Sequence, residues 1–89
     1  MTPGLMLAEN YPNPVISETT IEYALPEAML VELGIFDMRG TEVARIVDER
    51  QTAGIYKSNF RPGNLPSGNY IYRLTTPKGQ IAKQMVVVK

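Results

Sequence analysis

The stretch Thr19-Thr20-Ile21-Glu22-Tyr23-Ala24-Leu25 decides the fold class. Ile21, Tyr23 and Leu25 fall on one face of an extended chain, and the residues between them fall on the other. A strand that is packed on one side requires this alternation. Pro26, which has no backbone N–H to donate, ends the stretch. We therefore predict a β-strand with one buried face.

Short segments of the same kind recur along the chain, and no helical period is sustained over three turns. Val31 to Phe36 alternates in the same way, and Asp37-Met38-Arg39-Gly40 supplies the turn into the next strand, which predicts a hairpin. Pro77-Lys78-Gly79 predicts a second hairpin. The expected strands occupy residues 5–9, 19–25, 31–36, 42–47, 55–60, 69–76 and 80–89.

Three segments depart from clean alternation. The apolar residues between Glu42 and Val47 do not keep one parity, which indicates a bulge or an edge position. Residues 48–54 are expected to form a polar loop. Asn10-Tyr11-Pro12-Asn13-Pro14 must be irregular, because its two prolines remove backbone donors and restrict the residues before them.

The strand pattern favours an all-β, immunoglobulin-like antiparallel sandwich of about seven strands over a closed barrel. With 89 residues the chain is long enough for one small domain, which we place at residues 5–89. We interpret residues 1–4 as the remnant of a linker or as the start of a cloned fragment. Tyr70 or Tyr72 is a candidate tyrosine corner, although an ordinary core tyrosine is the favoured interpretation. The expected core comprises Ile21, Tyr23, Val31, Leu33, Ile35, Tyr70, Tyr72 and Leu74.

Composition excludes most function classes. Nine basic residues balance nine acidic ones, and they are scattered, so we expect no nucleic acid partner and no anionic membrane surface. No apolar run approaches the roughly 20 residues that span a bilayer, so we expect no membrane insertion. Without His or Cys, the Ser-His-Asp and Cys-His nucleophiles and ordinary zinc sites are impossible. Met1-Thr2-Pro3-Gly4 does not resemble a secretory signal.

The remaining chemistry is sparse. Asp48 and Glu49 share a segment, but no ladder of spaced acidic residues accompanies them, so calcium is a weak alternative. The glycines stand singly and form no phosphate cradle, and we expect no cofactor. Tyr11 and Phe36 are the candidate stacking rings if the domain binds carbohydrate.

The last stretch, Gln80 to Lys89, has the composition of a strand that runs almost to the final residue. We expect its free end to offer unpaired backbone groups, a carboxylate and two lysines to another protein. The alternative is a purely structural role, in which its apolar residues belong to the core and Lys89 is simply exposed to solvent. On this basis we predict that the domain is a signal recognised by another protein rather than an enzyme.

Five segments in order strongly resemble the C-terminal sorting domain of the type IX secretion system, over residues 5–89. They are Leu7-Ala8-Glu9-Asn10-Tyr11-Pro12-Asn13-Pro14, Thr20-x-Glu22-Tyr23-x-Leu25-Pro26, Val31-x-Leu33-x-Ile35-Phe36-Asp37-x-x-Gly40-x-x-Val43, Leu65-Pro66-Ser67-Gly68-x-Tyr70-x-Tyr72-x-Leu74 and Lys83-Gln84-Met85-Val86-Val87-Val88-Lys89.

The resemblance implies a non-catalytic, immunoglobulin-like signal domain of a protein from the Bacteroidetes and relatives. A separate signal carries such a protein to the periplasm, and the folded domain then directs its upstream cargo domain through an outer-membrane translocon. In this family a sortase-like cysteine peptidase usually removes the domain, and here the resemblance implies a cut upstream of or near residue 4. The cargo is released or is linked to lipopolysaccharide on the cell surface.

Carried over by position, the resemblance implies candidate translocon contacts at Lys83, Gln84, Met85, Val86, Val87, Val88 and Lys89, and family turn-motif positions at Gly40, Ser67, Gly68, Tyr70 and Tyr72. The family often has a second basic residue at the position of Gln84 and a tyrosine at that of Phe36. Two other functions stay open, namely a carbohydrate-binding or adhesion module of a secreted enzyme and a structural role like that of flagellar hook-capping proteins.

Overall fold

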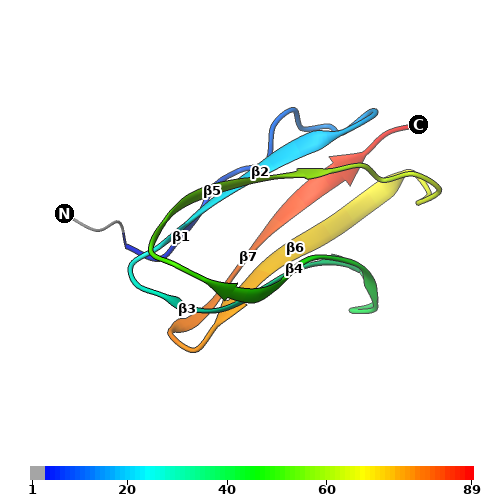
Figure 1. Cartoon of the computed structure of the whole chain (residues 1–89). Helices are drawn as coiled ribbons and strands as arrows, with labels where there is room; N and C mark the ends of the chain where they lie inside the picture. The colour runs from blue at the N-terminus through cyan, green and yellow to red at the C-terminus, as the bar shows by residue number, and fades with distance from the viewer. Residues whose placement is uncertain (1–3) are drawn as a thin grey trace.

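The computed structural model describes residues 4–89, and these residues form seven strands (Figure 1). Of the linker remnant expected at residues 1–4, all but Gly4 lies outside the described residues. No helix that could cross a membrane is found in the described part of the chain. The strands are β1 (Met6–Leu7), β2 (Thr19–Leu25), β3 (Met29–Asp37), β4 (Glu42–Gln51), β5 (Gly54–Phe60), β6 (Gly68–Thr76) and β7 (Gly79–Val87).

The strands make two antiparallel sheets, one in the order β1-β2-β5 and the other in the order β4-β3-β6-β7. This arrangement confirms the predicted all-β sandwich. The molecule measures 40 × 23 × 17 Å, and the described chain starts at one end of the long axis while Lys89 lies at the other end (Figure 1).

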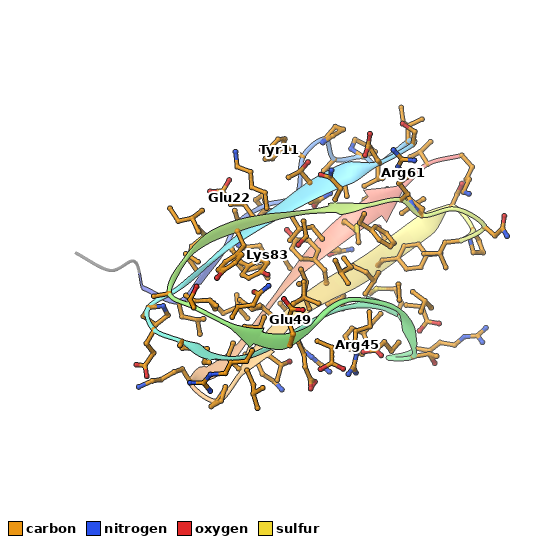
Figure 2. All side chains as sticks on the ribbon, in the orientation of Figure 1. Tyr11, Glu22, Arg45, Glu49, Arg61 and Lys83 are labelled. Carbon is orange, nitrogen blue, oxygen red and sulfur yellow. The ribbon has the colours of Figure 1, made fainter. Side chains whose placement is uncertain are left out.

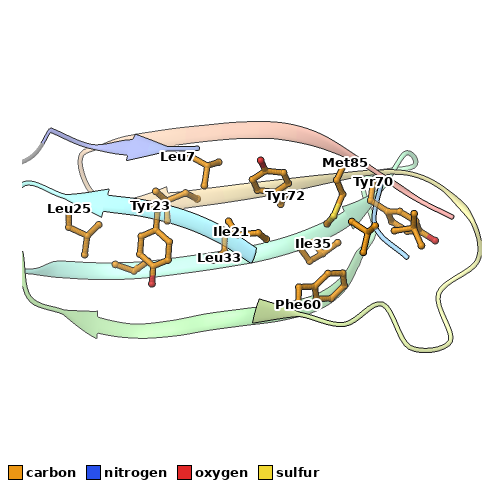
Figure 3. Close-up of a cluster of buried hydrophobic side chains, with 14 of the residues drawn as sticks. Leu7, Ile21, Tyr23, Leu25, Leu33, Ile35, Phe60, Tyr70, Tyr72 and Met85 are labelled. Atoms are coloured by element: carbon orange, nitrogen blue, oxygen red, sulfur yellow. The ribbon is translucent and has the colours of Figure 1, made fainter. Parts of the chain in front are cut away.

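The core lies between the two sheets, and all eight residues predicted to be inside are buried. Figure 3 shows side chains of this cluster, among them Tyr23 of β2 and Leu33 of β3, which belong to opposite sheets. Alternation therefore predicted the facing of β2, β3 and β6 correctly. The core also contains Leu25, which lies on the predicted buried face of β2. Six further core residues were not in the expected set, namely Leu7, Val15, Met29, Phe60, Met85 and Val87.

The segment after Val47 was predicted wrongly as a loop. β4 continues through Asp48 to Gln51, where it pairs with Met29 of β3, and only Thr52 and Ala53 separate it from β5. The sequence looks like a loop because β4 is an edge strand whose side chains are largely exposed, and charged residues are common on such strands. For Glu42 to Val47 the sequence predicted a bulge or an edge position, and both are confirmed. β4 is an edge strand, and its register with β3 shifts twice.

The two predicted hairpins are confirmed as the pairs β3–β4 and β6–β7. In the first turn the N–H of Gly40 donates to the carbonyl of Asp37 at 3.0 Å. The carboxylate of Asp37 accepts hydrogen bonds from the N–H groups of Arg39 and Thr41 at 2.9 and 3.0 Å. Gly40 has a φ of +89°, in the region that residues with a side chain rarely adopt.

Replacing Gly40 with alanine is expected to lower the free energy of unfolding by about 1–2 kcal/mol, because a Cβ is strained at positive φ. A Gly40→Asn variant is expected to lose less, since asparagine tolerates this conformation better. Urea unfolding of both variants measures the difference. Equal losses would contradict the explanation by backbone strain.

Candidate functional site

The C-terminal half of β7 lies directly beside β6, and this pairing joins the two groups of candidate residues. Tyr72 pairs with Lys83, Tyr70 with Met85, and Gly68 with Val87. The turn-motif positions and the terminal positions, which are separated in the sequence, therefore form one continuous piece of sheet.

The terminal residues divide between the two faces of that sheet. Met85 and Val87 are fully buried in the core, whereas Gln84 is exposed and the side chain of Val88 is 42% exposed. The structural role that we weighed for this stretch therefore applies to Met85 and Val87. The outward residues remain available for contacts with another protein.

The end of the last strand is not free, in contrast to our expectation. β7 ends at Val87, and Val15 forms a parallel bridge with that residue. The N–H of Val15 donates to the carbonyl of Val86 at 2.7 Å, and the N–H of Val88 donates to the carbonyl of Val15 at 2.8 Å. The N–H of Val86 donates to Asn13 Oδ1 at 3.0 Å. The expected unpaired backbone groups at Val86 and Val88 are thus partly occupied by the segment that follows the prolines.

Lys89 is held on its other side by the loop between β5 and β6. Its N–H donates to Ser67 Oγ at 2.9 Å, and its Nζ donates to the carbonyl of Gly63. Ser67 is one of the predicted turn-motif positions. The structure therefore joins Ser67 and Lys89 directly, and the final residue has a defined position.

The two lysines of the terminal motif have different surroundings. Lys83, which Figure 2 labels, has the same facing on β7 as the buried Met85 and Val87. Its Nζ is 3.4 Å from Glu9 Oε1. This ion pair ties the last strand to the start of the proline segment. An exposed pair of this kind contributes little stability. Of the two lysines, Lys89 is the one at the end of the sandwich.

A hollow of about 300 Å³ lies at this same end of the sandwich. Gly40 belongs to the turn that forms one wall, and the loop before β6 forms the other. The hollow is mainly apolar and open to solvent. The lining comprises Asp37, Met38, Arg39, Val43, Leu65, Pro66, Ser67, Gly68, Asn69 and Tyr70.

Tyr70 makes the bond expected of a tyrosine corner, so the favoured interpretation as an ordinary core tyrosine was wrong. Its hydroxyl donates to the carbonyl of Pro66, four residues upstream, at 2.6 Å. This bond fixes the loop that carries Ser67. The loop in turn holds Lys89.

Tyr72 fastens the start of the proline segment to the core. Its hydroxyl donates to the carbonyl of Ala8 at 2.7 Å and accepts from the N–H of Asn10 at 2.8 Å. Burial raises the pKa of Tyr72 to about 12, because the neutral phenol is favoured where water is excluded. The tyrosine is therefore a neutral, structural group at physiological pH.

The two candidate sugar-stacking rings lie on different sheets. Tyr11, whose side chain is 51% exposed, bridges Thr20 of β2. Phe36 is on β3, and the guanidinium carbon of Arg73 lies 4.2 Å from the centre of its ring. A Cβ on Gly34 would lie 3.1 Å from a carbon of the same ring. Arg73 thus covers one face of the Phe36 ring, and the two aromatic residues do not form one platform.

Asp48 and Glu49, considered for calcium, are neighbours in β4 and point to opposite faces of it. Asp48 pairs with Arg45 at 3.2 Å, and Glu49 accepts a hydrogen bond from Gln51 at 3.3 Å. Within residues 4–89 no group of three or more acidic side chains could hold a metal ion.

Asn13 and Val15 are the site residues that our sequence reasoning missed. The prolines around Asn13 indicated an irregular segment but gave no sign of what it contacts. Val15 is fully buried, and a branched apolar residue directly after Pro14 was the only available signal. Its partner, Val87, is more than 70 residues away in the sequence.

Comparison with protein families finds a match to the model described as "Secretion system C-terminal sorting domain", over residues 9–88. The match covers nearly the whole chain and includes every residue of this end of the sandwich except Lys89. A search of curated proteins finds no match.

Proposed function

Because the chain belongs to the family of secretion system C-terminal sorting domains of the type IX system, we propose that it directs an exported cargo protein across the outer membrane through the end of the sandwich that carries Lys89. The observation that carries this proposal is the family match over residues 9–88. Proteins sorted by this system reach the cell surface or are secreted. Domains of this family are generally not catalysts.

The proposed route runs through the periplasm to an outer-membrane translocon, after which a sortase-like peptidase removes the domain and the cargo is attached or released. The shape of the domain supports this arrangement. The upstream cargo domain would join at the end where the described chain starts, and Lys89 lies at the opposite end of the 40 Å axis (Figure 1). A translocon component can then contact the signal without meeting the cargo.

The proposed contact surface consists of the outward and terminal residues, chiefly Gln84, Val88 and Lys89, together with the loop that carries Ser67. Met85 and Val87 support this surface from the core. Removal of the whole segment from Lys83 to Lys89 would therefore damage the fold as well as the signal. Substitutions of exposed residues give a cleaner test.

The test fuses the domain behind an exported reporter in a host that has the type IX system. We expect the wild-type fusion to reach the surface. Lys89→Glu is expected to weaken binding to the translocon by about tenfold, which corresponds to a loss of about 1.4 kcal/mol in binding free energy, and thereby to reduce the exported fraction. The reporter is measured in the medium, at the cell surface and in the periplasm.

Lys78→Glu is the matched control, because it reverses an exposed charge in the β6–β7 turn at the other end of the sandwich. This variant should be exported like the wild type. Failure of the wild-type fusion to leave the periplasm would overturn the proposed function. Normal export of both Lys89→Glu and Val88→Glu would refute recognition at this end.

A further inference from the structure

Residues 86–88 are docked on a segment from the start of the chain. We propose that the sorting machinery recognises the signal while these residues stay docked, with Asn13 and Val15 acting as positioning residues. The inference rests on the proposed function and specifies how the partner contacts the signal. The docked form leaves side chains at the end of the sandwich for recognition, rather than a free strand edge.

Backbone hydrogen bonds along the outer edge of β7 favour recognition in the docked state. Val15 accepts from and donates to the backbone on either side of Val87, at 2.8 and 2.7 Å. These are the bonds of a parallel strand pair. A peptide of the partner that added itself as a strand beside Val86 and Val88 would need the same backbone groups. It could bind there only after Val15 had left.

Burial of the two bridging residues also favours the docked state. The side chains of Val15 and Val87 are 0% and 1% exposed, and both belong to the core. Release of the segment from β7 would uncover apolar surface that Val15 and Val87 now bury, in addition to breaking the backbone bonds. The docked state is therefore the state that a partner meets.

Asn13 supplies a side-chain oxygen to β7 in place of a strand partner. Its Oδ1 accepts from the N–H of Val86 at 3.0 Å. On the other side, Ser67 accepts from the N–H of Lys89 at 2.9 Å. The last residues are thus held from two directions, and Val88 and Lys89 are presented in one geometry. A preorganised surface of this kind lowers the entropic cost of binding.

A disulfide between positions 15 and 87 tests recognition in the docked state. The two valines are bridge partners, and the chain has no cysteine of its own, so Val15→Cys/Val87→Cys adds a single possible disulfide. In the reporter fusion we expect the locked domain to be exported at the level of the two single-cysteine variants. Nonreducing mass analysis measures the locked fraction, and thermal unfolding checks the fold.

Accumulation of the locked domain in the periplasm, with normal export of both single-cysteine variants, would overturn the proposal. That result would mean that the last strand must leave the segment in order to be recognised. It would leave the proposed function intact, because the single-cysteine variants would still be sorted. Failure of the wild-type fusion would instead count against the proposed function itself.

A series at Asn13 decides the question even if the disulfide does not form. Asn13→Ala removes the acceptor of the Val86 N–H. We expect the backbone amide hydrogen of Val86 to exchange with solvent at least about tenfold faster, and we expect export to fall. Asn13→Asp keeps an acceptor oxygen and should restore both. Thr20→Ala is the matched control, since it also removes one exposed side-chain bond, at 3.0 Å to Asn59, but away from β7.

Export of Asn13→Ala at the wild-type level, despite faster exchange at Val86, would refute the positioning role. Equal losses of export in Asn13→Ala and Thr20→Ala would also refute it, because a general loss of stability would then explain both. The cysteine pair in the Asn13→Ala background should recover export, since it holds the strand by another bond.

Discussion

Replacing Leu33 with alanine is expected to lower the free energy of unfolding by about 2–5 kcal/mol, the usual cost of deleting a buried leucine side chain. Leu33 is fully buried on β3, where it pairs with Val47 on one side and Leu74 on the other. β3 is an inner strand, so its neighbours on both sides are fixed and cannot easily fill the space. Urea unfolding monitored by tyrosine fluorescence measures the loss.

Leu30→Ala supplies the control on the same strand. The side chain of Leu30 is 60% exposed, so its removal should change the free energy of unfolding by no more than about 0.5 kcal/mol. Comparable losses at the two positions would show that β3 does not direct Leu33 into the core and Leu30 towards solvent.

Strand facing was predictable because it depends on a period of two within each segment. Ile21, Tyr23 and Leu33 need no information from elsewhere in the chain to be placed inside. Strand limits were less predictable, because an edge strand is defined by its neighbour. Asp48 to Gln51 look like a loop in isolation, yet they extend β4 because β3 offers partners as far as Met29.

The site was predictable only where one segment or a family motif contains the information. The motif named both Ser67 and Lys89, but nothing in the sequence indicated that these two residues are hydrogen-bonded. Alternation required one face of the last strand to be core, and the pairing of Tyr70 with Met85 determined which face. The bridge between Val15 and Val87 has no local signature, since it joins opposite ends of the chain.

Tyr72→Phe is the second substitution with a large expected effect, about 1–3 kcal/mol in the free energy of unfolding, because it leaves buried backbone groups without partners. The lost hydroxyl serves the carbonyl of Ala8 and the N–H of Asn10. Asn10 is almost fully buried, and its Oδ1 already lacks a partner among the described residues. Loss of the phenol would therefore leave two further polar groups unpaired at a site that already contains one.

Tyr72 also predicts how stability responds to alkali. Its pKa is raised by burial to about 12, whereas a tyrosine in an unfolded chain ionises near pH 10. The unfolded chain thus loses its proton first. The contribution of Tyr72 to the free energy of unfolding is fully present below about pH 10 and is lost as the pH rises towards 12. Burial raises the pKa of Tyr23 as well, so part of the alkaline loss should persist in Tyr72→Phe.

These two effects make one comparison decisive. At pH 8 the free energy of unfolding of the wild type should exceed that of Tyr72→Phe by the whole loss expected for the hydroxyl, about 1–3 kcal/mol. At pH 11 this gap between the two proteins should narrow, because only the wild type is penalised for keeping the Tyr72 phenol protonated. Tyr11→Phe, with its ring half exposed, should match the wild type at both pH values. A gap of constant size would mean that the Tyr72 hydroxyl is hydrated in the folded domain, and Tyr72 would then not be the buried anchor of the proline segment that positions the last strand.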